Sequence, residues 1–309
     1  MPSSRTVVAV DVGGTDIKAA LVEGDPAAPA VVDRLRRATP RGSTGTETAD
    51  ALVSLIAELV KSWSATAANP VEAVGVVVPG IVDADAGVGV FSANLGWRDY
   101  PFRAALSDRL GLPVVFDHDV RAGGLAESRL GAARGFTDAV VMPIGTGIAA
   151  ALVLGGRLHS GGGYAGEVGH LSLGAGELCG CGQHGCLELR ASSAAVARRY
   201  TERTGRPVHG AVDVANAVRA GDPAAAAVWA EAVEALAQAV ILLTTLLGLQ
   251  AVVLGGGLAM AGELLLAPLG DRLDELISFQ RRPELRLAAL GDEAGCLGAA
   301  LLAMDLLEG

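Results

Sequence analysis

Several features that define other classes of protein are missing from this sequence. Positive charge is not in surplus: 24 Lys and Arg residues face 34 Asp and Glu residues. The net charge of −10 argues against a nucleic acid partner, which normally requires a basic surface. Met1–Arg5 is too short and too polar for a signal peptide, and Val240–Leu249, the most apolar run, is too short to span a bilayer. We therefore expect a cytoplasmic protein without a membrane partner.

The composition is typical of a globular protein with room for two domains. The chain has 309 residues, of which 51% are hydrophobic and 19% are charged. Its 42 glycines are about twice the ~7% average usage, which indicates many tight turns and sites lined by backbone.

One short glycine-rich segment holds three of the four cysteines: Cys179, Cys181 and Cys186. His170 lies just upstream, and three thiolates with one imidazole form a tetrahedral ligand set that suits Zn²⁺. A disulfide is the competing interpretation, but it would leave one of the three cysteines unpaired. His184, inside the segment, is the rival fourth ligand.

Two glutamates, Glu167 and Glu188, flank this cluster. If the segment from Glu167 to His170 is a turn or short helix, residues i and i+3 share a face, and His170 can contact the metal through one nitrogen and a ligand through the other. The alternative is a folded zinc loop with two solvated glutamates. The spacing alone leaves both interpretations open.

Near the N-terminus, Val7–Val12 and Ile17–Val22 predict two strands joined by a Gly-Gly-Thr turn, Gly13 to Thr15, with Asp11 at the end of the first strand. The turn amides can face an anion. The segment lacks the GK[ST] of a Walker loop, and a strand rather than a helix follows, so it is not a Rossmann fingerprint.

A second segment repeats this pattern. Gly14–Val22 reads GTDIKAALV and Gly145–Val153 reads GTGIAAALV, with seven of nine positions identical. Both segments follow a β-branched run, so we expect a duplicated unit with two phosphate-sized turns. A chance likeness between two apolar strands is the alternative.

The other segments alternate between strand and helix patterns, which predicts an α/β fold. The expected helices are Thr46–Trp63, a helix ending at Arg129, Ala191–Arg203, Ala211–Ala220, Pro223–Leu247 and Glu293–Leu307. The expected strands are Ala73–Val78, Pro113–Phe116, Ala251–Leu254 and Leu285–Leu290, with a loop at Leu95–Pro101. Small residues in the last helix, including Gly298, would allow close packing, and Cys296 is expected to be a buried core thiol.

Two strand ends carry candidate site residues. Asp117, His118 and Asp119 follow the strand Pro113–Phe116, where ligands bind in open α/β sheets. One of the two aspartates is expected to cap the following helix and the other to serve the ligand. The turn Gly255 to Gly257 follows the strand Ala251–Leu254 and is flat enough for a base or ribose.

These motifs resemble the ROK family of repressors and sugar kinases, and most closely its zinc-containing bacterial glucokinases. The specific part is GYAGEVGH followed by CGCGQHGCLE; DVGGTDIK, IGTGI, VVLGGG and GDEAGCLGAA are similar to the family's phosphate, adenosine and hinge motifs. The resemblance implies an actin-like ATPase (duplicated ribonuclease H-like) α/β fold with two lobes and a cleft between them. The expected lobes are residues 1–122 with 295–309, and residues 123–294 with the zinc loop.

The resemblance also implies a role for each matching residue. Asp119 would be the general base for the 6-hydroxyl of glucose. Further sugar contacts would come from Asn94, His118, Glu167, His170 and Glu188. ATP and Mg²⁺ would lie against Asp11, Gly13, Gly14, Thr15, Lys18, Gly145, Thr146, Gly147, Gly255, Gly256 and Gly257. Structural zinc would be held by His170, Cys179, Cys181 and Cys186.

The sequence departs from the family pattern at three places. The family usually has Asn where His118 precedes the base, Arg121 replaces a common Asn, and Ala149 and Ala151 stand where glycine is usual. His118 affects the identity of the sugar more than the reaction. Fructose, mannose, allose and N-acetylhexosamines are therefore alternative substrates.

A sugar-sensing regulator is the alternative from another class. Family repressors carry a helix-turn-helix before the first hairpin, whereas only Met1–Thr6 precede Val7 here, so direct DNA binding is not expected. Dimers and tetramers are common in this family, so the resemblance implies a homodimer or homotetramer.

Overall fold

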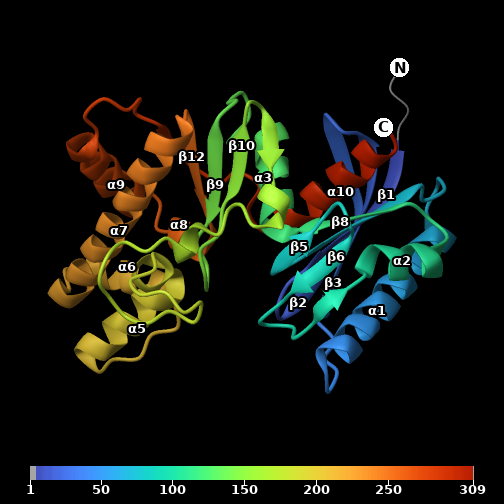
Figure 1. Cartoon of the computed structure of the whole chain (residues 1–309), viewed down its shortest axis with the longest axis horizontal. Helices are drawn as coiled ribbons and strands as arrows, with labels where there is room; N and C mark the ends of the chain where they lie inside the picture. The colour runs from blue at the N-terminus through green and yellow to red at the C-terminus, as the bar shows by residue number, and fades with distance from the viewer. Residues whose placement is uncertain (1–4, 309) are drawn as a thin grey trace. The chain divides into compact units, whose positions relative to one another are not determined.

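The computed structural model describes residues 5–308, which form two compact units (Figure 1). Unit 1 comprises Met1–Leu130, Ser160–Ala165 and Asp292–Gly309, and unit 2 comprises Gly131–His159 and Gly166–Gly291. Met1–Ser4, most of the segment that is too short and too polar for a signal peptide, lie outside the described residues. The boundaries between the units lie after residues 130 and 291. The boundaries between the expected lobes lie after residues 122 and 294. Helix α3 (Asp119–Arg129) explains the first difference, because it packs along α10 (Ala294–Leu306) and stays whole within unit 1.

Unit 1 is built on a five-stranded sheet in the order β3-β2-β1-β4-β8. β1 pairs antiparallel with β2, and β2 with β3, whereas β4 and β8 continue the sheet in parallel. A second, three-stranded antiparallel sheet has the order β5-β6-β7. The strands are β1 Arg5–Val12, β2 Asp16–Asp25, β3 Ala28–Ala38, β4 Ala73–Val78, β5 Ile81–Asp83, β6 Val88–Phe91, β7 Arg98–Tyr100 and β8 Val114–His118.

Alternation along β1 divides the core of unit 1 between two faces of the sheet. Val8, Val10 and Val12 are fully buried in a cluster with α1 (Gly45–Thr66) and α2 (Phe102–Leu110). Val7 and Ala9 point the other way, into a cluster with small residues of α10. Successive side chains of a strand face opposite sides, so this continuous apolar run suits a strand covered on both faces.

Close packing of α10 depends on its small residues, as expected. A Cβ on Gly298 would lie 1.9 Å from the carbonyl oxygen of Ala122 in α3, so only glycine fits there. Cys296 is buried on the same helix, which confirms the expected core thiol.

We predict that Gly298→Leu destabilises the protein by about 1–3 kcal/mol or more, because the new side chain must push α3 and α10 apart. Thermal or urea unfolding would measure the loss. The control is Gly210→Ala in unit 2, where the backbone is extended and no atom lies within 4 Å of an added Cβ. Unchanged stability of the Gly298 variant would contradict the packing argument.

Unit 2 repeats the sheet of unit 1. Its order is β11-β10-β9-β12-β13. β10 pairs antiparallel with β11 and with β9, whereas β12 pairs parallel with β9 and with β13. Both sheets thus have the same order and the same strand directions, which confirms the duplicated unit predicted from the two hairpins. The strands are β9 Ala139–Pro143, β10 Ala151–Leu154, β11 Arg157–His159, β12 Ala251–Gly255 and β13 Glu284–Leu287.

The helices of unit 2 pack around α7 (Pro223–Leu247). Asp222 caps its start by accepting hydrogen bonds from the N–H groups of Ala224 and Ala225, and Gly248 ends it in the left-handed conformation with φ 62°. The others are α4 Glu188–Ala191, α5 Ser193–Thr204, α6 Ala211–Arg219, α8 Gly256–Ala259 and α9 Glu263–Leu276. Short 3-10 helices are η1 Gly161–Gly163 and η2 Val168–His170 in the middle of the chain and η3 Gly291–Glu293 before α10.

Among the described residues, α7 alone is long and apolar enough to cross a membrane by length and composition, with a mean hydropathy of 1.6 over 18 residues. The run Val240–Leu249, expected to be too short to span a bilayer, lies mostly in the last part of this helix. However, 56% of that window is buried inside the protein, as in the core helix of a globular protein.

Three other expectations need correction. Leu95–Pro101 contains the short strand β7, because Arg98 and Tyr100 pair with β6. The expected last strand Leu285–Leu290 is Glu284–Leu287. Neither Asp117 nor Asp119 is the cap of α3: the cap position is His118, which makes no side-chain cap hydrogen bond, and Asp119 is the first helical residue.

Candidate functional site

The first candidate phosphate turn joins β1 to β2. The N–H of Gly13 donates to the carbonyl of Asp16 (2.8 Å), which closes the turn, and Thr15 is exposed at its tip. The hydroxyl of Thr39 donates to the carbonyl of Gly13 (2.8 Å), and the guanidinium of Arg41 donates to that of Gly14 (2.6 Å). Three hydrogen bonds therefore hold the backbone of this turn.

The second candidate turn, from Gly145 to Gly147 between β9 and β10, is built in the same way. The N–H of Gly145 donates to the carbonyl of Gly147 (3.0 Å), and Thr146 is exposed, as Thr15 is. Its support comes from α5, where the N–H of Ser193 donates to the carbonyl of Gly145 (2.8 Å).

The expected turn Gly255 to Gly257 is instead the end of β12 followed at once by the start of α8, and it lies against Ile144. The N–H of Ile144 donates to the carbonyl of Gly255 (2.9 Å), and the N–H of Leu258 donates back to Ile144 (3.1 Å). Ile144, the residue before the second turn, is thus joined to the predicted adenosine segment by two backbone hydrogen bonds.

Asp11 lies at the end of β1, beside the start of α10. A Cβ on Gly295 would lie 2.4 Å from a carboxylate oxygen of Asp11, so the glycine makes room for this side chain. Burial raises the pKa of Asp11 to about 7, and the negative charge of Asp119 adds to the effect. A carboxylate whose ionised form is disfavoured gains from a nearby cation, so Asp11 is suited to hold one.

Lys18, expected among the ATP-contacting residues, is turned toward a different partner. Its Nζ forms an ion pair with Asp292 (2.8 Å), and Asp292 also pairs with Arg36 (2.8 Å). The pKa of Asp292 is lowered by these two basic groups, first by Lys18. In this arrangement Lys18 holds the start of α10 to the sheet.

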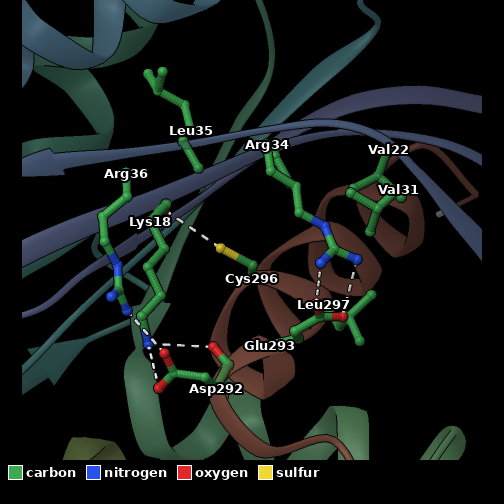
Figure 2. Close-up of a pocket in the computed structure, with 12 residues that line it drawn as sticks. Lys18, Val22, Val31, Arg34, Leu35, Arg36, Asp292, Glu293, Cys296 and Leu297 are labelled. Carbon is green, nitrogen blue, oxygen red and sulfur yellow. Dashed lines mark hydrogen bonds and ion pairs between the residues drawn. The ribbon is translucent and has the colours of Figure 1, made fainter.

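Figure 2 shows the pocket that these ion pairs border, between β2, β3 and the start of α10. It has a volume of about 300 Å³, with apolar side chains and the thiol of Cys296 in its wall. Arg34 pairs with Glu293 across it. The thiol donates to the carbonyl of Lys18 (3.3 Å), and burial raises its pKa to about 12, so it is neutral.

Asp119 lies where β8 passes into α3, and 28% of its side chain is exposed. Burial raises its pKa to about 6, while a hydrogen bond from the N–H of Val120 and the charge of Arg121 act in the opposite direction. A carboxylate with a pKa near the working pH is suited to accept a proton. Asn94 is exposed on the loop before β7, and its carbonyl accepts a hydrogen bond from Arg41.

The predicted metal ligands lie together in unit 2. One donor atom each from His170, Cys179, Cys181 and Cys186 falls within 4.8 Å of every other. The Sγ atoms of Cys181 and Cys186 are 3.6 Å apart, and Nδ1 of His170 is 3.7 Å from Sγ of Cys179. A tetrahedron with metal–sulfur bonds of ~2.3 Å has edges of about 3.8 Å, so these spacings fit Zn²⁺.

The rival ligand His184 is outside the cluster. Its Nδ1 lies 3.1 Å from the carbonyl oxygen of Gly176, and the side chain is exposed. The Cys₃His set thus uses His170.

Glu167 and Glu188 connect the cluster to the second turn. Glu167 and His170 share one turn of 3-10 helix, closed by a bond from the N–H of His170 to the carbonyl of Glu167 (3.0 Å). Glu167 is the residue before this helix and its backbone is not helical (ψ 45°), so the hydrogen bond, and not helical spacing, joins the two residues. Oε2 of Glu188 accepts a hydrogen bond from the N–H of Ile148 (2.9 Å), next to the second turn.

Three supporting residues were not identified from the sequence: Thr39, Arg41 and Ser193. They belong to no periodic pattern, and their partners are carbonyl oxygens far away in the chain. The sequence Thr-Pro-Arg from residue 39 to residue 41 indicates the end of a strand. It is the one sequence feature that points to Thr39 and Arg41.

The chain is similar to known proteins over nearly its whole length. The profile of the ROK family matches residues 7–306. A glucokinase of Halalkalibacterium halodurans is 33% identical and the alignment covers 97% of this chain and 95% of that protein. The crystal structure of a ROK hexokinase from Thermus thermophilus has a TM-score of 0.82 at 35% identity, covering 98% of this chain and 100% of that one.

A structure of a ROK family glucokinase from Streptomyces griseus, in complex with glucose and AMPPNP, has a TM-score of 0.78 at 31% identity. It covers 97% of this chain and 99% of its own. These likenesses confirm the actin-like ATPase fold expected from the motifs. With a family match over almost every residue, and with the duplicated sheets, the paired turns and the Cys₃His cluster in place, this chain belongs to the ROK family.

Proposed function

We propose that this protein is an ATP-dependent hexokinase that phosphorylates the 6-hydroxyl of glucose. The relatives named glucokinase match the chain over nearly its full length, and the Streptomyces griseus relative was crystallised with glucose and an ATP analogue. The observation that carries the proposal is the state of Asp119: a partly exposed carboxylate at a strand end with a pKa of about 6.

Asp119 is the general base in this proposal. Phosphoryl transfer needs little covalent help from the protein, so catalysis consists mainly of alignment and charge stabilisation. Asp119 accepts the proton of the attacking hydroxyl. Asn94, Glu167, His170 and Glu188 bind the remaining hydroxyls, each of which would cost ~1–3 kcal/mol if buried without a partner.

The phosphates of ATP lie on the two turns, at Gly13, Gly14 and Thr15 and at Gly145, Thr146 and Gly147, with adenosine at Gly255–Gly257. The N–H groups of Gly13 and Gly145 close the turns, so the other N–H groups of these turns would face the phosphate oxygens. Asp11 would hold Mg²⁺, and the ion would offset charge on the phosphates. Lys18 reaches the phosphates only by leaving Asp292.

Zinc has a structural role in this proposal. A closed Cys₃His site fixes the ring of His170, and with it the turn that carries Glu167. Burial raises the pKa of the Cys186 thiol to about 12, so this ligand would lose its proton only when it binds the metal.

We further propose a cytoplasmic homodimer or homotetramer with no nucleic acid or membrane partner. The net charge of −10 supports the absence of nucleic acid.

The test of the proposed function is a coupled assay of ADP release across glucose, fructose, mannose, allose and N-acetylhexosamines. We expect ADP release that requires a hexose and is fastest with glucose. Another preferred hexose would keep the reaction and change the substrate. ADP release that no hexose stimulates would reject the kinase and favour a sugar-sensing protein.

The pH dependence of kcat/KM is a second prediction. Asp119 must be ionised to accept a proton, and its pKa is about 6. We expect kcat/KM to fall about tenfold per pH unit below pH 6 and to level off above it. A profile that stays flat from pH 7 to pH 5 would contradict the assignment of Asp119.

A further inference from the structure

His118, the residue before Asp119, is held at one end of the parallel sheet. It pairs with Val78 as the last residue of β8, and only 9% of it is exposed. Its Nε2 lies 3.2 Å from Oδ1 of Asp119. Oδ1 also accepts the hydrogen bond from the N–H of Val120 (2.7 Å), so both contacts involve the same carboxylate oxygen.

The neighbouring ion pair does not compete for this contact. Arg121 is buried and bonds to Asp117, with Nε 2.8 Å from Oδ1, and its Nη atoms donate to the carbonyls of Val82 and Gly163. The guanidinium is thus occupied with Asp117 and two carbonyl groups. His118 is the side chain in contact with the carboxylate of Asp119.

The charged groups around Asp119 come from several elements. Arg121 acts on it from α3 and favours its ionised form. Asp11, from β1, repels it, and Asp11 is itself affected by Lys18 on β2 and Asp292 on η3. Cys296 of α10 contributes no charge, because its thiol is neutral.

We propose that His118 is a positioning residue for Asp119: Nε2–H of the imidazole holds Oδ1, so that Oδ2 is presented to the hydroxyl that attacks ATP. This inference rests on the proposed function, in which Asp119 is the base. In this tautomer Nε2–H is the donor of the imidazole, and its contact with the base leaves no ring N–H for a sugar oxygen. His118 therefore does not replace the sugar-binding amide that the family usually carries at this position.

The distance of the donor nitrogen from Cα distinguishes a residue that positions Asp119 from one that binds sugar. Nε2 of histidine lies four bonds from Cα, as does Nε2 of glutamine, whereas Nδ2 of asparagine lies three bonds away. His118→Gln retains a donor near the position of Nε2, and His118→Asn introduces the usual family residue with a shorter reach. The two variants differ by one methylene and are otherwise matched in chemistry.

The test measures kcat and KM of both variants and of His118→Ala with the preferred hexose. We expect His118→Gln to retain kcat within about threefold. We expect His118→Asn and His118→Ala to lower kcat by about 10- to 100-fold with little change in KM, since a misplaced base slows the chemical step. If His118→Ala does not fold, the pair of amide variants decides.

Two results would overturn the inference. One is a His118→Asn enzyme equal to wild type, and the other is a loss confined to KM. Either would mean that His118 binds sugar as the family's amide does.

A measurement without catalysis separates this inference from the proposed function. Carboxyl ¹³C NMR of the sugar-free protein, with Asp119→Asn to identify the signal, gives the pKa of Asp119. Because a donor favours the ionised form, we expect the pKa to be higher in His118→Asn than in wild type and in His118→Gln. Equal values in all three would reject the contact. A wild-type protein without hexose-dependent ADP release would reject the proposed function and leave this result intact.

Discussion

Asp119→Asn is expected to lower kcat by about 100- to 10,000-fold, the range that a positioned general base contributes. The substitution removes the proton acceptor and keeps nearly the same volume. The amide is also neutral, so it does not repel Asp11 as the carboxylate does. We therefore expect the hexose KM to change by less than about tenfold and the folded protein to be at least as stable, because the repulsion between two carboxylates is removed.

The measurement combines steady-state kinetics with calorimetric titration of the hexose. The matched control is Asp108→Asn on the exposed surface of α2, which should leave kcat unchanged. The acid limb near pH 6 should also disappear from the residual activity of the Asp119 variant. If Asp119→Asn retains more than about a tenth of wild-type kcat, Asp119 is not the base.

The sequence predicts those parts of the fold that depend on local patterns. The β-branched runs, the repeated GT turns and the capped helix Pro223–Leu247 are each encoded within about 25 residues of chain. The Cys₃His set is equally local, since all of its ligands lie between His170 and Cys186.

Such local patterns do not predict polar contacts between residues that are far apart in the chain. Arg41 bonds to Gly14, and Lys18 pairs with Asp292, which lies 274 residues away. Whether a lysine faces a phosphate or an aspartate depends on a register between β2 and the start of α10 that no local pattern contains. The strand β3 was also missed, because its exposed and half-buried residues lack the apolar alternation of a strand with one buried face.

Removal of the metal is expected to abolish high-affinity sugar binding while Asp119 stays in place. Without a cation, no bond holds the three cysteines and the histidine around a single point. The 3-10 helix η2 then loses the contact that fixes the positions of His170 and Glu167. Loss of two hydrogen bonds to the sugar, one of them to a charged group, corresponds to about 2–4 kcal/mol, or roughly a 30- to 1,000-fold higher KM. kcat at saturating hexose should fall less than the affinity.

The experiment compares protein treated with a chelator, Cys181→Ala and untreated protein, with zinc measured by atomic spectroscopy and hexose affinity by calorimetry. Cys296→Ala is the matched control, because its thiol lies on α10 in unit 1, and His184→Ala tests the rejected ligand. Both should retain one zinc per chain and normal affinity, and zinc added back to chelated protein should restore binding. A zinc-free protein that binds and phosphorylates hexose normally would remove the metal from the sugar site and leave Glu167 and His170 positioned by the backbone bonds of η2 alone.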